Sequence, residues 1–382
     1  MKCFKFIDLF AGIGAFHIAL QQLGGECVFA SEIDKHSIQV YKQNFNINSD
    51  NDMFKIKPND IPHHDVLCAG FPCQPFSNAG NKLGFSDTRG TLFFEIERIL
   101  QEHKTKFIIL ENVKGLVNHD NGNTYTTIIN HLKNLGYVLT KDPLIISPHQ
   151  LGIPQNRERI FIIGIHKNYC KKDYLDFNMP KEEDYPLQSL YSLLDNKVSP
   201  KYNISQEEEL IFDAWDEFKQ IFSKFPHPTL IDEFGQTYDI SDLALWKQQY
   251  CKKNRDFYID NKEILDKWID KYKVKDFKKR DKKFEWQAGD NYKSVYDTLI
   301  QLRQSGIRCK KPITFPALVA IVQTSIVAKY KRRITPREAA RLQSFPENFI
   351  LHSNDAIAYK QLGNSANVEV IKYIVQQLFS QI

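Results

Sequence analysis

The sequence lacks the features of a membrane protein, of a secreted disulfide scaffold and of a zinc protein. No apolar run in the 382 residues approaches the roughly 20 that cross a bilayer. The stretch from Met1 to Asp8 does not have the form of a signal peptide. The 7 cysteines are odd in number and include no Cys-x-x-Cys pair, and His63-His64 has no ligand set around it. We therefore expect an intracellular, cytoplasmic protein with no metal and no membrane attachment.

The sequence also has no large excess of charge. A hydrophobic content of 42% with 25% charged residues is that of an ordinary globular protein. The formal net charge of +5 suits nucleic acid without requiring it. Basic residues interleave with aromatic ones at 271–283 and 329–333. Such clusters favour phosphate contacts, although each run alone is equally consistent with a solvated face.

Strand-like and helix-like segments alternate over about the first 165 residues. Alternation of this kind predicts a parallel-rich sheet with helices on both faces, which is the α/β class. The expected strands are 4–10, 27–30, 65–69, 107–110, 137–146 and 159–165. The expected helices are 13–23, 34–44, 91–103 and 124–135.

The rhythm stops near residue 170, where charged and aromatic residues mix. Ser205–Glu208 has the form of a capping box, and Thr335–Glu338 has the form of a helix start. Two helical apolar faces are predicted, and an amphipathic helix is expected over 365–379. Their members are Ile211, Trp215, Phe218 and Phe222 in the first face, and Ile264, Leu265, Trp268, Ile269 and Tyr272 in the second. We expect three parts, 1–175, a smaller domain over 176–351, and a C-terminal helix segment 352–382 that returns to the first.

A glycine loop follows the first strand and an acidic residue ends the second. Gly12 and Gly14 lie between a strand and a helix, where glycine lets the backbone approach a ligand closely. Glu32 follows about 20 residues later, where a carboxylate can accept both ribose hydroxyls. Together they favour an adenosine-containing cofactor, either a dinucleotide or S-adenosylmethionine. A plain tight turn and a helix-start carboxylate are the structural alternatives.

A cysteine between proline and glutamine follows the third strand. Proline limits how the backbone of Gly70–Phe76 can move, so the direction of the Cys73 thiol is restricted. A thiolate is a strong nucleophile. Glu111 ends the next apolar strand and should lie at the same edge of a parallel sheet, where a carboxyl group can hold and protonate a ring nitrogen. A buried cysteine and a helix-start acid are the alternatives.

Two arginines open a later strand. Gln155 begins this segment, so Arg157 and Arg159 are expected to alternate with Glu158 across the two faces of the strand. Surface ion pairs are the alternative interpretation.

These segments resemble the ordered motifs of DNA cytosine-5 methyltransferases of the bacterial restriction–modification type. The matching segments are Asp8–Phe16, Gly70–Ser77, Glu111–Val113, Gln155–Arg159, Arg332–Pro346 and Gln361–Ser365. Residues 176–310 lie outside the resemblance, where the family keeps its variable target-recognition region. The resemblance implies an α/β, Rossmann-like S-adenosylmethionine-dependent methyltransferase fold, with a mostly parallel sheet in the catalytic domain and a second, smaller target-recognition domain.

The resemblance also implies an activity and its residues. A methyl group would pass from S-adenosylmethionine, leaving S-adenosylhomocysteine, to C5 of a cytosine flipped out of a short duplex DNA sequence. Cys73 would add to C6 of the base, and Glu111 would bind N3 and the exocyclic amine. Arg159 would bind O2 with Arg157 supporting the site, and Asn112 would brace the Pro-Cys loop.

The cofactor pocket is assigned by the same resemblance. Phe10 would lie near the adenine, Glu32 would bind the ribose, Ile33 would pack on the ring, and Asp52, chosen over Asp60, would contact the adenine amine. The full set of expected cofactor contacts is Phe10, Ala11, Gly12, Gly14, Glu32, Ile33, Asp52, Met53, Pro72, Asn364 and Ser365.

Duplex DNA is the partner that the resemblance implies, with a cognate restriction endonuclease as a functional partner and a monomeric enzyme. Residues 77–90 correspond to the family's mobile loop, which closes over DNA behind an extruded base; an ordinary surface loop is the alternative. Side chains suited to phosphates and base edges complete the prediction. The expected DNA contacts are Gln74, Ser77, Arg89, Arg303, Gln304, Arg308, Lys310 and Lys311.

The chain departs from the family pattern at two places. Gly14-Ala15 stands where Gly-Gly is common, and a methyl group there is tolerated if Ala15 is helical. The usual Thr-Leu pair of the recognition region has its best counterpart in Pro316-Ala317-Leu318.

Two other functions share many of these motifs. A transfer-RNA cytosine-5 methyltransferase has the same fold, but the large insertion between Asn168 and Lys331 favours a reader of duplex DNA. A catalytically inactive DNA-binding regulator would not be expected to keep Cys73, Glu111 and Arg159 together.

Overall fold

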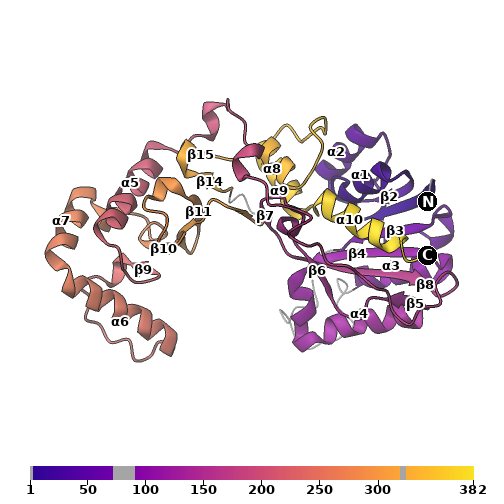
Figure 1. The fold of residues 1–382 in the computed structure, drawn as a ribbon, viewed down its shortest axis with the longest axis horizontal. Helices are drawn as coiled ribbons and strands as arrows, with labels where there is room; N and C mark the ends of the chain where they lie inside the picture. Colours follow the sequence, from indigo (N-terminus) through magenta and orange to yellow (C-terminus); the bar gives the residue numbers. More distant parts are fainter. Residues whose placement is uncertain (1–2, 72–90, 319–323) are drawn as a thin grey trace. The chain divides into compact units, whose positions relative to one another are not determined.

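A computed structural model gives the fold and describes residues 3–71, 91–318 and 324–382 (Figure 1). The chain forms two compact units. The first comprises Met1–Ser189, Pro316–Val322 and Pro336–Ile382, and the second comprises Leu190–Phe315 and Gln323–Thr335. Their bounds differ from those of the predicted domains, whose functional assignment stays a prediction. None of the helices within the described ranges is long and apolar enough to cross a membrane.

Some predicted residues lie outside the described ranges. These are Pro72, Cys73, Gln74, Ser77 and Arg89, together with the rest of the predicted closing loop at 77–90.

The first unit is built on a seven-stranded sheet of order β2-β1-β3-β4-β8-β5, with β6 also paired to β8. β2, β1, β3 and β4 are parallel, β8 is antiparallel to β4, and β5 and β6 are antiparallel to β8. The strands are β1 (Phe4–Leu9), β2 (Gly25–Ser31), β3 (Val66–Gly70), β4 (Phe107–Val113), β5 (Tyr137–Leu139), β6 (Leu144–Ile146) and β8 (Arg159–His166). This confirms the predicted α/β class with a mainly parallel sheet. The single strand expected over 137–146 is wrong, because the segment turns at Asp142-Pro143 and proline cannot continue a ladder.

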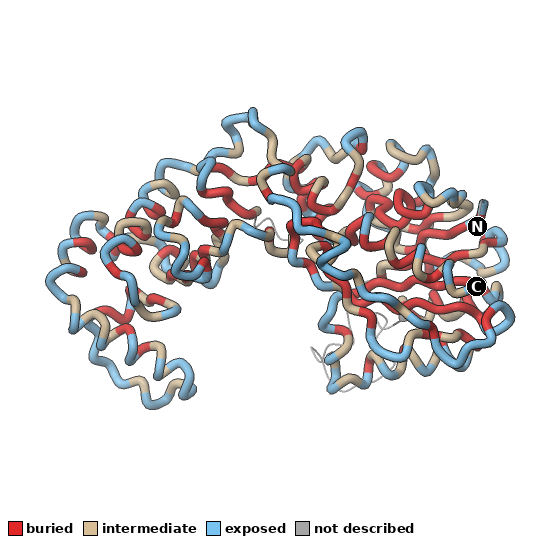
Figure 2. The backbone as a smooth tube through the Cα atoms, in the orientation of Figure 1, coloured by how far each residue is buried: buried red, intermediate tan, exposed pale blue. Residues whose placement is uncertain are grey.

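Helices cover both faces of this sheet (Figure 1). On one face, α3 and α4 bury a core with Ile7, Leu9 and Leu67. Side chains alternate along a strand, so Phe6 points to the other face, where its ring lies 5.5 Å from that of His17 in α1. Figure 2 shows these strands buried along most of their length. The helices are α1 (Ala15–Gln22), α2 (Lys35–Phe45), α3 (Thr91–His103), α4 (Asn123–Asn134), α8 (Pro336–Leu342), α9 (Asp355–Asn364) and α10 (Val368–Phe379).

The last helix begins later than the expected residue 365. The side chain of Asn367 accepts a hydrogen bond from the backbone N–H of Val370 at 3.1 Å and so caps α10. Residues 365–367 form the turn between α9 and α10 instead.

The second unit contains a six-stranded sheet of order β15-β14-β11-β12-β10-β9. Its strands are β9 (Thr229–Leu230), β10 (Lys283–Gln287), β11 (Leu299–Arg303), β12 (Gly306–Lys310), β14 (Ile326–Val327) and β15 (Arg332–Arg333). Its α-helices are α5 (Gln206–Ile221), α6 (Leu245–Asp260) and α7 (Lys262–Tyr272). The sequence did not indicate this sheet, because strands of 2 to 5 residues leave little room for a periodic pattern.

The two helices predicted in this unit are present. Ser205 and Glu208 form the capping box of α5, with hydrogen bonds of 3.0 and 3.1 Å. Trp215 of the predicted apolar face is fully buried and stacks on Phe284 at a ring distance of 4.5 Å. Ile264 was wrongly placed on the buried face of α7, since its side chain is 47% exposed.

Lysines of the basic cluster 271–283 form ion pairs with acidic residues of the same unit. Lys278 Nζ lies 2.7 Å from Glu207 Oε1, and Lys271 pairs with Glu217. Exposed pairs of this kind contribute only about 0–1 kcal/mol each. The contacts favour the interpretation of 271–283 as a solvated face rather than a phosphate site.

Candidate active site

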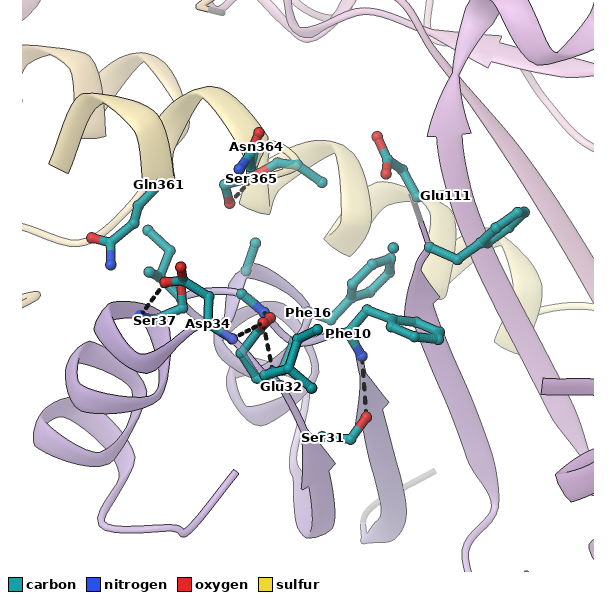
Figure 3. Close-up of a pocket in the computed structure, with 18 of the residues that line it drawn as sticks. Phe10, Phe16, Ser31, Glu32, Asp34, Ser37, Glu111, Gln361, Asn364 and Ser365 are labelled. Atoms are coloured by element: carbon teal, nitrogen blue, oxygen red, sulfur yellow. Dashed lines mark hydrogen bonds between the residues drawn. The ribbon is translucent and has the colours of Figure 1, made fainter. Parts of the chain in front are cut away.

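A cavity of about 1040 Å³ opens where β1, β2, β3 and β4 of the first unit end (Figure 3). Ligands of open α/β sheets bind at these carboxyl ends. Lining side chains come from the loop after β1, from the β2–α2 turn, from β4 and from the end of α9. Among the predicted residues, the wall includes Phe10, Ala11, Gly12, Glu32, Ile33, Asp52, Met53, Glu111, Asn112, Arg159, Asn364 and Ser365.

The two glycines of the loop after β1 have different surroundings. Gly14 caps α1 with φ +91°, and a Cβ there would lie 2.3 Å from Phe45 Cε2. Gly12 has φ +56°, and a Cβ there would meet no atom within 4 Å. Gly14 therefore permits packing against α2, whereas Gly12 leaves room at the cavity wall. Ala15 is the first residue of α1, so its methyl group is accommodated in the helix.

Three backbone N–H groups fix the carboxylate of Glu32 at the end of β2. Its Oε1 accepts from Ile33 and Asp34 at 2.8 and 2.9 Å, and its Oε2 accepts from Gly12 at 2.7 Å. A carboxylate has about four lone-pair positions. The remaining position on Oε2 is open to a hydroxyl donor, which is what a ribose would supply.

Apolar side chains are exposed around the same wall. Ile33 is 74% exposed and Phe54 is 55% exposed, so both present apolar surface at the cavity. Phe10 has φ 55°, a conformation that non-glycine residues rarely adopt, and its N–H donates to Ser31 Oγ at 3.3 Å. Flat apolar rings such as adenine suit this surface.

The structure distinguishes between Asp52 and Asp60, the two candidates for the contact with the adenine amine. Asp52 lines the cavity, and its hydrogen bond with Lys55 holds the pKa of its carboxyl below the usual range. Asp60 ends the short helix η1 (Pro58–Asp60) and is not among the described residues that line the cavity.

Glu111 and Arg159 form an ion pair at the other end of the cavity. Glu111 of β4 lies beside Gly70 of β3, and its side chain reaches 3.0 Å from Nε of Arg159. Burial raises the pKa of Glu111, and the charges of Arg159 and Arg157 oppose this effect without cancelling it. Burial therefore favours the protonated form of Glu111 more than it would for an exposed carboxyl group.

Asn112 holds the chain that leads into the Pro-Cys segment. Its Nδ2 donates to the carbonyl oxygen of Phe71 at 3.0 Å, and the side chain is buried. This bond fixes the last described residue before Cys73, in keeping with the bracing role expected of Asn112.

Arg157 does not continue the strand that was predicted through Arg159. The short strand β7 (Gln155–Asn156) ends before it, and β8 begins at Arg159. Arg157 is only 2% exposed and lies behind the cavity wall. It therefore supports the site from outside.

A buried acid that the sequence did not indicate lies beneath the glycine loop. Asp8 at the end of β1 is fully buried, and neither of its carboxylate oxygens has a hydrogen-bond partner in the described part of the chain. Burial raises its pKa well above the usual range, the backbone N–H of His17 opposes this, and the charge of Glu32 adds to it. Burial therefore favours the protonated form of Asp8 in the folded protein.

The sequence analysis did not identify several other residues that line the cavity. They include Phe16, Asp34, His36, Ser37, Phe54, Lys360 and Gln361. Phe16 follows the glycine loop within the first turn of α1, and Lys360 precedes Asn364 by one helical turn. Helical spacing from the predicted motifs could have found both.

The predicted DNA-contacting arginines of the second unit share one carboxylate. Glu285 of β10 lies 2.6 Å from Arg308 of β12 and 3.1 Å from Arg303 of β11. Lys283 lies 3.7 Å from the same carboxylate, and burial lowers the pKa of Lys310, with Arg308 and Arg303 adding to the effect. This sheet face thus has more positive than negative charge, while Gln304 and Lys311 are exposed beside it.

Comparisons with known proteins agree along the whole chain. Residues 4–380 match the family described as C-5 cytosine-specific DNA methylase. Type II methyltransferase M1.ScrFI of Lactococcus lactis subsp. cremoris is 37% identical over 379 residues, which cover 98% of this chain and 78% of the relative. Type II methyltransferase M.HpaII of Haemophilus parainfluenzae is 34% identical over 372 residues, covering 97% and 87%. The crystal structure of a mutant DNMT2 of Spodoptera frugiperda superposes with a TM-score of 0.59 at 21% identity, covering 98% of this chain and 99% of that one, and so supports the fold.

Proposed function

Because the chain belongs to the C-5 cytosine-specific DNA methylase family and is a DNA (cytosine-5)-methyltransferase, we propose that it modifies cytosine within a short duplex sequence as the modification enzyme of a type II restriction–modification system. The observation that carries the site assignment is the buried Glu111–Arg159 pair beside a cavity that suits an adenosine cofactor.

S-Adenosylmethionine fits the cavity by the chemistry of its wall. Glu32 keeps one acceptor position for a ribose hydroxyl, and the exposed apolar surface of Ile33 and Phe54 can cover an adenine ring. Asp52 offers an acceptor for the adenine amine, and Asn364 and Ser365 bound the opposite wall. When bound, the cofactor supplies the methyl group that the reaction transfers.

The base site would work through an acid, Glu111, and a cation, Arg159. Protonated Glu111 can donate to N3 of cytosine, which draws electrons from the ring and makes C6 electrophilic. Arg159 can donate to O2 and stabilise the negative charge that develops there. The Cys73 thiolate would then form a bond to C6, leaving C5 nucleophilic. After C5 has taken the methyl group, a water molecule would accept the C5 proton as the C6–S bond breaks and releases the thiolate. The proton on N3 would then return to Glu111, which restores the ring and the acid.

Target recognition is assigned to the second unit. Arg303 and Arg308 are oriented by Glu285, and arginine is the side chain that most often reads the O6 and N7 acceptors of guanine. Lys310, Lys311 and Gln304 lie on or beside the same strands and complete the proposed DNA contacts. We expect this unit to choose the sequence, while the first unit performs the chemistry.

Methylation sequencing tests the function directly. DNA from a bacterial host that expresses the chain should carry 5-methylcytosine at one short sequence after bisulfite treatment. The same DNA should resist an endonuclease that cuts this sequence. Purified protein should transfer a radiolabelled methyl group to duplex DNA and not to transfer RNA. Labelling of transfer RNA alone would contradict the assigned substrate.

Trapping tests the assigned nucleophile. Duplex DNA with 5-fluorocytosine at the target should form a covalent adduct with the wild-type protein, because fluorine cannot leave C5 as a proton does. Cys73→Ser should form no adduct and should still bind DNA. Full methylation by Cys73→Ser would remove this residue from the mechanism.

A further inference from the structure

Arg157 binds three backbone carbonyls from two distant parts of the first unit. Its Nη2 donates to the carbonyl oxygens of Gly363 and Ser365 at 2.8 and 2.7 Å, and its Nη1 donates to that of Leu318 at 2.7 Å. The backbone N–H of Arg157 donates to Ser147 Oγ at 2.8 Å, which anchors the arginine itself.

The bonds to Gly363 and Ser365 complete the end of α9. The last four carbonyls of a helix have no partner within it, and a cation at this end is favourable. Gly363 lies in the last turn of α9, and Ser365 is its C-cap. Hydrogen bonds from a charged donor are stronger than those between neutral groups. Arg157 thus fixes the backbone that carries Asn364 and Ser365 into the cavity (Figure 3).

The bond to Leu318 links this wall to another segment. Pro316–Val322 belongs to the first unit but lies, in the chain, between the two stretches that form the second. A guanidinium is planar, with its donors in a fixed fork. A shift of Leu318 relative to Gly363 therefore lengthens at least one of the three bonds. Arg157 therefore opposes movement of the carbonyl group of Leu318 away from those of Gly363 and Ser365.

We propose that Arg157 is a positioning residue that holds the Gly363–Ser365 wall in its cofactor-binding position and couples that position to the Pro316–Leu318 segment. The proposal rests on the function above, with S-adenosylmethionine in the cavity. Neither Arg157 nor Pro316–Leu318 lines the cavity in the described part of the chain, so each acts through the wall. Cofactor binding and the conformation of the Pro316–Leu318 segment are then linked through the side chain of Arg157.

A lysine substitution with a matched control tests the proposal. Arg157→Lys keeps the charge but cannot span three carbonyls. Arg337→Lys is the control, because Arg337 also donates to two backbone carbonyls, of Pro346 and Phe349, that do not line the cavity. We expect Arg157→Lys to weaken binding of S-adenosylhomocysteine at least tenfold in calorimetry, to raise KM for S-adenosylmethionine similarly, and to change kcat less than threefold. Arg337→Lys should leave these constants within twofold of wild type.

The affinity for duplex DNA measures the coupling between the cavity wall and the Pro316–Leu318 segment. In the wild type, S-adenosylhomocysteine should change the affinity for the methylated site duplex, and Arg157→Lys should abolish this change while Arg337→Lys keeps it. Equal behaviour of the two lysine variants overturns the proposal. Failure of the wild type to bind S-adenosylhomocysteine at all would instead overturn the proposed function.

Hydrogen exchange of the wild-type protein tests the proposal without a variant, which matters if Arg157→Lys does not fold. In the wild-type protein, S-adenosylhomocysteine should slow amide exchange in peptides covering 316–318, which do not line the cavity, as well as in those covering 361–367. Protection confined to residues that line the cavity would show that Arg157 does not transmit the binding event.

Discussion

The Nε atom of Arg159 lies 3.0 Å from Oε1 of Glu111, and both side chains are largely buried. Each group satisfies the charge that burial would otherwise penalise. Burial still raises the pKa of Glu111 and lowers the pKa of Arg159. The pair therefore places a carboxyl group with a raised pKa beside a cation, and these are the two groups that the proposed cytosine site uses at N3 and O2.

The raised pKa of Glu111 predicts a pH profile. The protonated form donates to N3, so kcat/KM should fall as pH rises through the raised pKa. Glu111→Gln cannot transfer a proton and should lower kcat by about 10²–10⁴-fold, with a flat profile on this limb. Single-turnover methylation between pH 5.5 and 9 measures both effects. Glu158→Gln, an exposed neighbour, is the control and should keep the wild-type profile. A wild-type profile in Glu111→Gln would exclude the acid role.

The glycine loop predicts opposite consequences for two similar substitutions. Gly14→Ala forces a methyl group against Phe45 and strains a left-handed backbone, so it should destabilise the protein by more than the roughly 1–2 kcal/mol of backbone strain alone. Gly12→Ala carries only the backbone strain, but its methyl group lies at the cavity wall, so it should chiefly weaken cofactor binding. Urea denaturation and calorimetry with S-adenosylhomocysteine separate the two. Equal stability of both variants would contradict the packing assigned to Gly14.

Asp8 predicts how stability depends on pH. Its pKa is higher in the folded than in the unfolded chain, so above the ordinary value near 3.8 the folded state holds a proton that the unfolded state releases. This group's contribution to stability therefore declines as pH rises towards the folded pKa. Asp8→Asn should remove the decline, and its melting temperature relative to wild type should increase from pH 5 to pH 8.

An exposed acid provides the control for Asp8. Asp60→Asn in η1 should track the wild type across the same pH range. A constant difference between Asp8→Asn and wild type at every pH would mean that Asp8 is charged in the folded protein.

The shared carboxylate of Glu285 predicts a change of specificity. Arg308→Gln removes a donor suited to guanine and should relax discrimination at one position of the site by about 1–3 kcal/mol, or roughly 5–150-fold. Glu285→Gln should relax it less, because both arginines remain. Methylation of a randomised duplex library followed by bisulfite sequencing measures each position. Lys278→Ala, which lies in the solvated basic cluster, should not change the sequence preference. An unchanged preference in Arg308→Gln would remove this residue from base reading.

Local patterns in the sequence were sufficient for much of the fold. The capping box at Ser205 and Glu208 and the helix over 91–103 form as predicted, because these signals depend on residues within one or two turns of each other. The parallel direction of β1, β3 and β4 was predicted from the alternation of strands and helices along the chain. Signals of this kind failed where strands were short, as in the second unit's sheet.

The motifs by themselves also predicted part of the chemistry. The glycine loop and Glu32 favoured an adenosine-containing cofactor, and Glu111 at a strand end suited a ring nitrogen, whereas cytosine as the ring followed from the resemblance of the motifs to a family. The order of the motifs along the chain identified the family, which the comparisons confirm.

Only the tertiary structure decided what burial and distant contacts do to these groups. Arg157 belongs to the same sequence motif as Arg159. Its guanidinium nevertheless binds the carbonyl groups of Leu318 and Gly363, which lie 161 and 206 positions further along the chain. Asp8 is an ordinary strand-end acid in the sequence, and its raised pKa exists only because the sheet and α1 exclude water from it. A sequence pattern reports neighbours along the chain, whereas desolvation and charge pairing depend on neighbours in space.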